Sequence, residues 1–243
     1  MFSKYFSIFA LVSFVSAVPS VKVIPCTFMT REYPLIGNIH ECFTSSVEFR
    51  EPDELVDNVT LTLPNGVTMN DINALWIHDT ISHFFPKGVE DFFTNLTVIQ
   101  VSSSGLKAIT QDDLKPFTNL KGLWLNENDL ISLEPNLFQF NTELRIIRFD
   151  SNRIRSIPRS IFDPLVKLTE VHFTGNVCTS LVAKSKMELN LIVWDIIQRC
   201  QSSEDGESCQ DEYNEIRNLK AALTKQVLKN AEMKKKIYEI AGL

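Results

Sequence analysis

The side chains that could do chemistry are few and widely spaced in this 243-residue sequence. It contains no His-Glu-x-x-His pair, no Gly-x-Ser-x-Gly turn, no Cys-x-x-Cys pair and no glycine-rich phosphate loop. The two closest histidines, His78 and His83, lie on either side of a predicted strand end, and no third or fourth metal ligand accompanies them. We therefore expect no catalytic residue, no metal site and no cofactor.

The five cysteines predict disulfide chemistry in an oxidising compartment. The economical pairing joins Cys26 to Cys42 and Cys178 to Cys200. Cys209 is then left for a bond to a second chain. In the alternative, Cys209 pairs within the chain and leaves Cys178 or Cys200 free.

Composition and charge exclude several classes of protein. Residues 1–17 have the form of a removable signal peptide, and no later segment reaches the roughly 18 apolar residues of a membrane span. The net charge of −6 disfavours nucleic acid as a partner. The tripeptides that begin at Asn58 and Asn95 are glycan acceptors. We expect a secreted, extracellular glycoprotein without membrane insertion.

A pattern of apolar residues recurs every 24 residues in the middle of the chain. Positions 1, 4 and 6 of the five registers are Ile72, Leu75 and Ile77; Leu96, Ile99 and Val101; Leu120, Leu123 and Leu125; Leu144, Ile147 and Phe149; and Leu168, Val171 and Phe173. Positions 4 and 6 are alternate residues of a short strand, so both point to the same face. The pattern predicts an α/β solenoid, a leucine-rich repeat horseshoe with 24-residue repeats.

Two further sets of residues are expected to build the interior. Asn128, Asn152 and Asn176 occupy position 9, where an asparagine can hydrogen-bond the backbone of neighbouring coils. The return segments are rich in phenylalanine, including Phe138 and Phe140. We expect these rings to fill the solenoid rather than to form an aromatic ligand site.

A solenoid exposes its apolar core at both ends and needs caps. We divide the chain into a signal peptide (1–17), an N-terminal disulfide cap (18–71), five leucine-rich repeats (72–177), a C-terminal cap (178–203), and a hinge with a coiled-coil-like helix (204–243). The residues between Cys26 and Cys42 are expected to form a loop. Residues 181–199 are expected to form a helix across the last coil.

The concave strand face is the predicted partner-binding surface. Its outward positions include Trp76, Val98, Gln100, Trp124, Asn126, Ile146, Arg148, Asp150 and His172. Tryptophan, arginine and neighbouring aliphatic residues are enriched where proteins bind proteins. In the alternative, the tryptophans only cover the strand face.

Residues 212–241 carry apolar residues with a spacing of seven, and Asn230 lies at a position where a buried polar residue often fixes register. We expect this helix to pair with a helix of a second chain, in a homo- or heterodimer. Two alternatives stay open: the helix packs on its own solenoid, or it stands solvated. Cys209 lies seven residues before the first seam position, Ile216, and could link two chains there.

Segments 85–93, 113–120 and 174–178 resemble those of secreted leucine-rich repeat proteins of dipteran insects (flies, midges and mosquitoes). The whole layout is also similar to the leucine-rich immune proteins of mosquito haemolymph, which join a solenoid, a cysteine-rich junction and a coiled coil. This resemblance implies disulfide-linked complexes that bind complement-like factors. The chain departs from that group in having fewer repeats, one hinge cysteine and a shorter coiled coil.

Together, these observations predict a secreted, non-catalytic module that binds an extracellular protein ligand on its concave strand face, in innate immune recognition. The alternative is a structural or adhesive protein of the extracellular matrix, or of a secretion, that assembles through its C-terminal helix.

Overall fold

The structure is a computed structural model that describes residues 21–200 except 34 and 53. The signal peptide expected at 1–17, Cys209, and the helix expected at 212–241 lie outside the described residues. The chain divides into two units, 1–201 and 202–243, and the described residues all belong to the first. None of the helices in this described part is long and apolar enough to cross a membrane.

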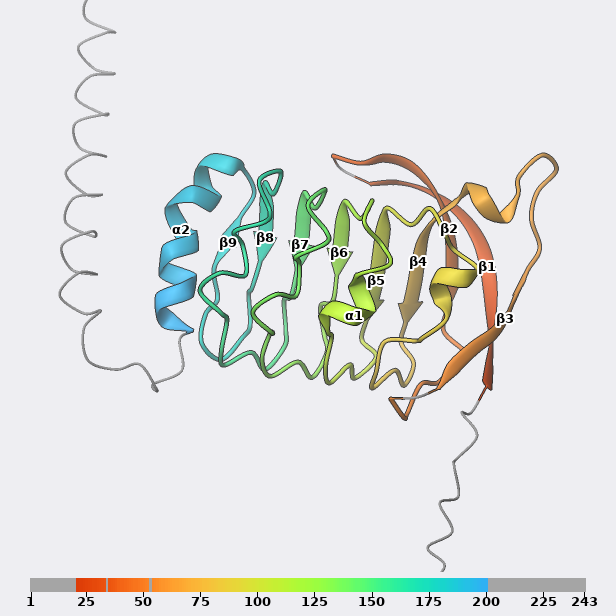
Figure 1. Ribbon diagram of the computed structural model, residues 1–243, viewed down its shortest axis with the longest axis horizontal. Coiled ribbons are helices and arrows are strands. Elements are labelled where there is room, and N and C mark those ends of the chain that lie inside the picture. The colour runs from red at the N-terminus through yellow and green to blue at the C-terminus, as the bar shows by residue number, and fades with distance from the viewer. Residues whose placement is uncertain (1–20, 34, 53, 201–243) are drawn as a thin grey trace, which may run out of the picture. The chain divides into compact units, whose positions relative to one another are not determined.

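A single sheet organises the described part of the chain. Its nine strands lie in the order β3-β1-β2-β4-β5-β6-β7-β8-β9 (Figure 1). The strands are β1 (Val21–Tyr33), β2 (Gly37–Thr44), β3 (Leu55–Leu61), β4 (Ile72–His78), β5 (Val98–Ser102), β6 (Gly122–Trp124), β7 (Ile146–Arg148), β8 (Glu170–His172) and β9 (Val182–Ala183). The helices are η1 (Met69–Asp71), η2 (Val89–Asp91), α1 (Gln111–Leu114) and α2 (Lys186–Arg199).

Strands β4 to β8 pair in parallel with no slip between them. Each residue pairs with the residue 24 positions further along the chain, as in Leu75 with Ile99 and Ile99 with Leu123. The inward residues at this level are all fully buried, namely Leu75, Ile99, Leu123, Ile147 and Val171. The described part of the chain, a sheet of mostly parallel strands with a disulfide near each end, has a leucine-rich-repeat-like fold.

Asparagine side chains tie each coil to the one before it. Asn128 Nδ2 donates to Val101 O at 2.7 Å, while its Oδ1 accepts from Ser104 N at 3.1 Å and Leu106 N at 3.0 Å. Asn152 and Asn176 also bond to the backbone of the preceding coil. The backbone-bonding role predicted for the position-9 asparagines is confirmed.

Most phenylalanine rings of the return segments lie in the interior, but Phe140 does not. The rings of Phe149 and Phe173 stack at 5.4 Å, and Phe138 is buried beside Phe149. Phe140 is 36% exposed, and the Lys115 ammonium lies 5.5 Å from its ring centroid. The prediction of an interior position is wrong for Phe140, because within the turn at 135–140 it is Phe138 that takes the buried position.

The C-terminal end of the sheet is closed by β9 and α2. Val182 and Ala183 pair antiparallel with β8, so the helix begins at Lys186 and not at residue 181. Ser185 caps it, since its side chain accepts a hydrogen bond from Glu188 N at 3.2 Å. A disulfide between Cys178 and Cys200 joins the end of this helix to the last coil.

At the N-terminal end, β1 and β2 form a long antiparallel hairpin where a loop was expected. Seven residue pairs connect its arms, from Thr27–Phe43 to Tyr33–Gly37, and the second disulfide, Cys26–Cys42, joins the two strands near the base. The loop prediction is wrong because both arms carry residues with high strand propensity, including Phe28 and Ile39.

Candidate protein-binding face

The side chains of β4 to β8 that point away from the interior form a surface that we call the outer sheet face. Its central column follows directly from the strand pairing and consists of Trp76, Gln100, Trp124, Arg148 and His172. Val98 and Ile146 lie in the column beside it, each paired with Gly122. Asn126 and Asp150 follow the ends of β6 and β7. The fold therefore gathers the predicted residues on one face.

The tip of the β1–β2 hairpin covers the apolar part of this face. Figure 1 shows the two strands reaching back from the β4 side of the sheet. The ring of Tyr33 lies 5.2 Å from that of Trp124, and Arg145 Nη1 donates to Leu35 O at 3.1 Å. The buried residues form a hydrophobic cluster separate from the main core, made of Tyr33, Ile39, Ala74, Val98, Trp124 and Ile146.

This cover changes what the predicted binding residues can do. Val98 is fully buried, Ile146 is 2% exposed and Trp124 is 8% exposed. These three residues pack against the hairpin of the same chain, so they do not belong to the accessible part of the face. For Trp124, the alternative that the ring only covers the strand face fits the geometry.

Trp76 also contacts the hairpin. The Arg31 guanidinium lies 4.3 Å from its ring centroid, and Phe43 meets it edge-on at 4.8 Å. Its indole nitrogen donates to Ser102 Oγ at 3.2 Å. Cation–π and edge-to-face contacts of this kind stabilise a packed ring. Both outward tryptophans of the central column thus help to hold the hairpin.

A buried carboxylate reinforces the same contact. Glu41 is fully buried; the Tyr33 hydroxyl donates to its Oε2, and Arg31 Nη2 lies 3.6 Å from its Oε1. Burial raises the pKa of Tyr33 well above its ordinary value, and the hydrogen bond to Glu41 and the charge of Glu41 raise it further. Tyr33 therefore keeps its proton and serves as a permanent donor to the carboxylate.

The end of the face near β7 and β8 is polar and partly exposed. Four residues make it up, and we call them the polar strip: Arg148, Asp150, Glu170 and His172. Arg148 Nε lies 3.2 Å from Asp150 Oδ2, and His172 Nε2 lies 2.6 Å from Glu170 Oε1. The other ring nitrogen of His172 is 3.7 Å from Asp150 Oδ1. These groups hold one another in place. Arg148, with a side chain that is 40% exposed, offers hydrogen-bond donors to a protein surface, and Asp150 and Glu170 are partly exposed, whereas His172 is itself buried.

The remaining predicted residues, Gln100 and Asn126, form hydrogen bonds with residues close to them in the sequence. Gln100 Nε2 donates to Ser102 Oγ at 3.2 Å, and Asn126 Nδ2 donates to Glu127 Oε1 at 3.3 Å. Gln100 and Asn126 are both half-buried.

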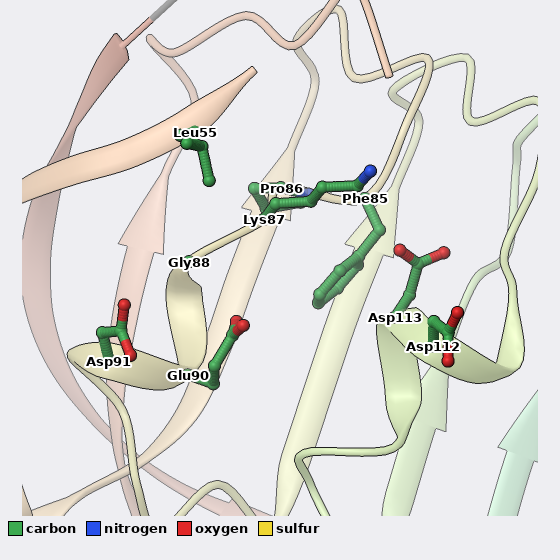
Figure 2. A pocket seen from close by; sticks show the side chains of 9 residues that line it. All are labelled: Leu55, Phe85, Pro86, Lys87, Gly88, Glu90, Asp91, Asp112 and Asp113. Atoms are coloured by element: carbon green, nitrogen blue, oxygen red, sulfur yellow. The ribbon is translucent and has the colours of Figure 1, made fainter. Parts of the chain in front are cut away.

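A separate hollow of about 340 Å³ lies among the return segments. Figure 2 shows four carboxylates around it, those of Glu90, Asp91, Asp112 and Asp113, together with Lys87. Asp113 is already used in a helix cap, where its Oδ2 accepts from Thr110 N at 2.8 Å. No group of three potential metal ligands occurs among the described residues.

Sequence reasoning missed the hairpin cover, although a signal was present. Tyr33 and Ile39 flank a short stretch of sequence that contains Pro34 and Gly37, residue types typical of turns. Apolar residues around such a turn indicate a hairpin. Nothing in that pattern, however, says that the tip packs on residues far along the chain, such as Trp124.

Comparisons with known proteins give local similarity. The chain matches no family model. It is 30% identical over 95 residues to mouse Toll-like receptor 9, which covers 39% of this chain and 9% of that protein. It is also similar to a solved structure of the Toll–Spatzle complex of Drosophila, with a TM-score of 0.42 and 20% identity over 50% of this chain and 17% of that one. Both are leucine-rich repeat proteins.

Proposed function

We propose that the chain is a secreted, non-catalytic protein-binding module, a leucine-rich repeat horseshoe with 24-residue repeats that recognises an extracellular protein on its concave strand face. The pairing of residues 24 apart in β4 to β8 and the two disulfides support this architecture. The local similarity to a Toll-like receptor supports innate immune recognition as the setting. The proposal includes the signal peptide at 1–17, kinship with the secreted dipteran proteins, and dimerisation through 212–241.

The observation that carries the proposal is the polar strip beside the hairpin tip. The Arg148 side chain is 40% exposed, and Leu35 at the tip is 54% exposed. The contact from Arg145 to Leu35 O fixes the tip at this end of the sheet. An exposed apolar side chain at the hairpin tip, together with the arginine and the two carboxylates of the polar strip, would combine an anchor with a polar rim, as protein interfaces do.

The test compares two charge reversals, Arg148→Glu in the polar strip and Arg155→Glu on an exposed position of the return segment. A photo-crosslinking amino acid placed at position 126 of the secreted full chain would capture the partner from extracellular fluid, for identification by mass spectrometry. We expect Arg148→Glu to reduce the yield at least about tenfold, since removing one charged contact commonly costs 2 kcal/mol or more. Arg155→Glu should leave the yield unchanged. Equal yields from both folded variants would refute the strip as the binding site.

A further inference from the structure

The outermost strand of the sheet, β3, has one edge without a partner strand in the described part of the chain. Its inner edge pairs in parallel with β1. On the outer edge, Val56 N donates to Lys87 O at 2.8 Å, next to an isolated bridge between Leu55 and Lys87. Past that bridge, Val59 N donates to the Asn58 side chain, its Oδ1, at 2.8 Å. The rest of the edge has no partner strand among residues 21–200 and is available for pairing there.

Exposed apolar side chains lie on the two outermost strands, β3 and its neighbour β1. Val21 is 62% exposed, Val23 is 47% exposed, and Leu55, which pairs with Val21, is 37% exposed. An open strand edge with exposed apolar residues is a template for edge-to-edge association of chains. A protein that stays dispersed needs a device that blocks it.

The two glycan acceptors differ in what their amide nitrogens do. The Asn95 Nδ2 donates to Asn70 O at 3.1 Å, so this nitrogen is engaged. Asn58 is exposed, and its Oδ1 takes the bond from Val59 N, which leaves Nδ2 without a partner among the described residues. Thr60, the third acceptor residue, is exposed and points to the same face of β3 as Asn58, because strand side chains alternate.

We propose that Asn58 carries an N-linked glycan that guards the outer edge of β3 against pairing with another chain. In the transfer, Asn58 Nδ2 loses a proton and bonds to the anomeric carbon of a lipid-pyrophosphate-linked oligosaccharide. The bond from that carbon to the pyrophosphate oxygen breaks, and the lipid pyrophosphate leaves. The step needs no oxidant or reductant, and the donor is the general one of the secretory compartment.

The position of Asn58 makes the glycan an effective guard. A pairing strand has to approach to about 4.8 Å along the whole edge. A solvated, bulky sugar on Asn58 of the edge strand would obstruct that approach, and Asn58 Oδ1 already accepts a hydrogen bond from Val59 N at 2.8 Å. The glycan and the asparagine together remove both the room and one of the donors that a second chain would use.

The first experiment measures occupancy on the secreted full chain from a glycosylating host. Release of N-glycans by an amidase in heavy-oxygen water converts an occupied asparagine into labelled aspartate, which peptide mass spectrometry detects. We expect label at position 58 in most molecules, and less at position 95. An unlabelled Asn58 would overturn the proposal.

The second experiment measures association by light scattering at rising protein concentration. Thr60→Ala removes the acceptor without changing Asn58, and Thr60→Ser keeps it. We expect the weight-average mass of Thr60→Ala to rise above that of wild-type protein, with Thr60→Ser unchanged. Thr97→Ala, which removes the acceptor at Asn95 away from the edge, should also leave the mass unchanged. Equal masses for Thr60→Ala and Thr60→Ser would contradict the guard.

Trimming of the native wild-type glycan to a single sugar should reproduce the rise in mass without any substitution. This keeps the test decisive if Thr60→Ala fails to fold. The inference shares with the proposed function only the export of the chain. Loss of partner capture in the Arg148→Glu variant reports on the polar strip, whereas occupancy and light scattering report on β3, so either idea can fail while the other stands.

Discussion

Single asparagines connect the coils of this protein through their side-chain amides. Each of Asn128, Asn152 and Asn176 uses its amide nitrogen to reach a carbonyl of the preceding coil, at 2.7 to 2.8 Å. Asn152 is buried, so water cannot reach the backbone groups around it, and its side chain supplies their hydrogen bonds instead. Removal of such a side chain leaves buried donors and acceptors unpaired.

We therefore expect Asn152→Ala to lower the free energy of unfolding by about 1–3 kcal/mol, the cost of leaving a buried backbone N–H unpaired. That group is Leu130 N, which donates to Asn152 Oδ1. Leu125 O and Phe149 O lose their bonds from Asn152 Nδ2 but keep those from Asn128 and Asn176. Urea unfolding would measure the change. Asn126→Ala, whose side chain bonds only Glu127, should cost less than about 0.5 kcal/mol. Similar costs for both variants would contradict this account.

A second prediction concerns the Tyr33 hydroxyl. Tyr33→Phe removes the donor to the buried Glu41 carboxylate, and we expect a loss of about 1–3 kcal/mol at neutral pH. The pKa of Tyr33 is raised by burial and then by Glu41, so the folded state holds this proton more tightly than the unfolded state does. Stability from this group is complete below the unfolded pKa of about 10 and falls as the pH rises above it.

Comparison of the two proteins isolates this effect. The difference in free energy of unfolding between wild type and Tyr33→Phe should stay constant up to about pH 10 and shrink above it. Denaturant unfolding at a series of pH values would measure it. A difference that grows with pH would show that the sign is wrong.

At the scale of the element, the turn after each strand repeats with the strands. Asp79, Ser103, Glu127, Ser151 and Gly175 are spaced by 24 residues, and each has a positive φ, between 51° and 75°. Left-handed backbone is unfavourable for residues with a Cβ. The chain accepts this strain in four of the five turns because the parallel pairing on both sides fixes the backbone.

Gly175 is the one residue of this set that avoids the strain, and this makes it a test. Gly175→Ala should lower the free energy of unfolding by about 1 kcal/mol, since φ at this position is +75°. An added Cβ would meet Ser151 no closer than 3.4 Å, so the cost comes from the backbone and not from a clash. Thr174→Ala, the exposed neighbour, should change stability by less than about 0.5 kcal/mol in the same urea titration.

At the scale of the whole molecule, the open question is assembly. The proposed dimer rests on residues 212–241 and on Cys209, which belong to the second unit of the chain. Cys209 is the one cysteine outside the two disulfides of the structure. It is therefore the natural candidate for a bond between chains.

We expect the secreted protein to run as a dimer on a gel without reductant and as a monomer with it. Cys209→Ser should run as a monomer in both lanes while keeping its noncovalent mass in light scattering. The Cys178–Cys200 disulfide closes the last coil, so a Cys178→Ala/Cys200→Ala variant controls for general disulfide loss. A wild-type monomer under both conditions would exclude the intermolecular bond.

The strands and the inward-facing residues of the repeating part of the molecule can be predicted from the spacing of residues in the sequence. A strand buries alternate residues and an unsatisfied amide must find a partner, so the spacing of Leu75, Ile99 and Leu123 and the placement of Asn128 already constrain the coils. These are local rules, and a pattern of fixed period expresses them directly. The helix of the C-terminal cap was also predicted from the sequence, although it begins at Lys186 and not at residue 181.

Which part of the outer sheet face is accessible can be seen only in the tertiary structure. Tyr33 and Trp124 are 91 residues apart in the sequence, from 33 to 124, and their rings meet because the hairpin turns back over the sheet. That contact depends on the length of two paired arms and on the fit of Ile39, Val98 and Ile146 into one buried cluster. Packing between distant surfaces leaves no periodic trace in a sequence, so the same residues read as a binding face until the fold covers them.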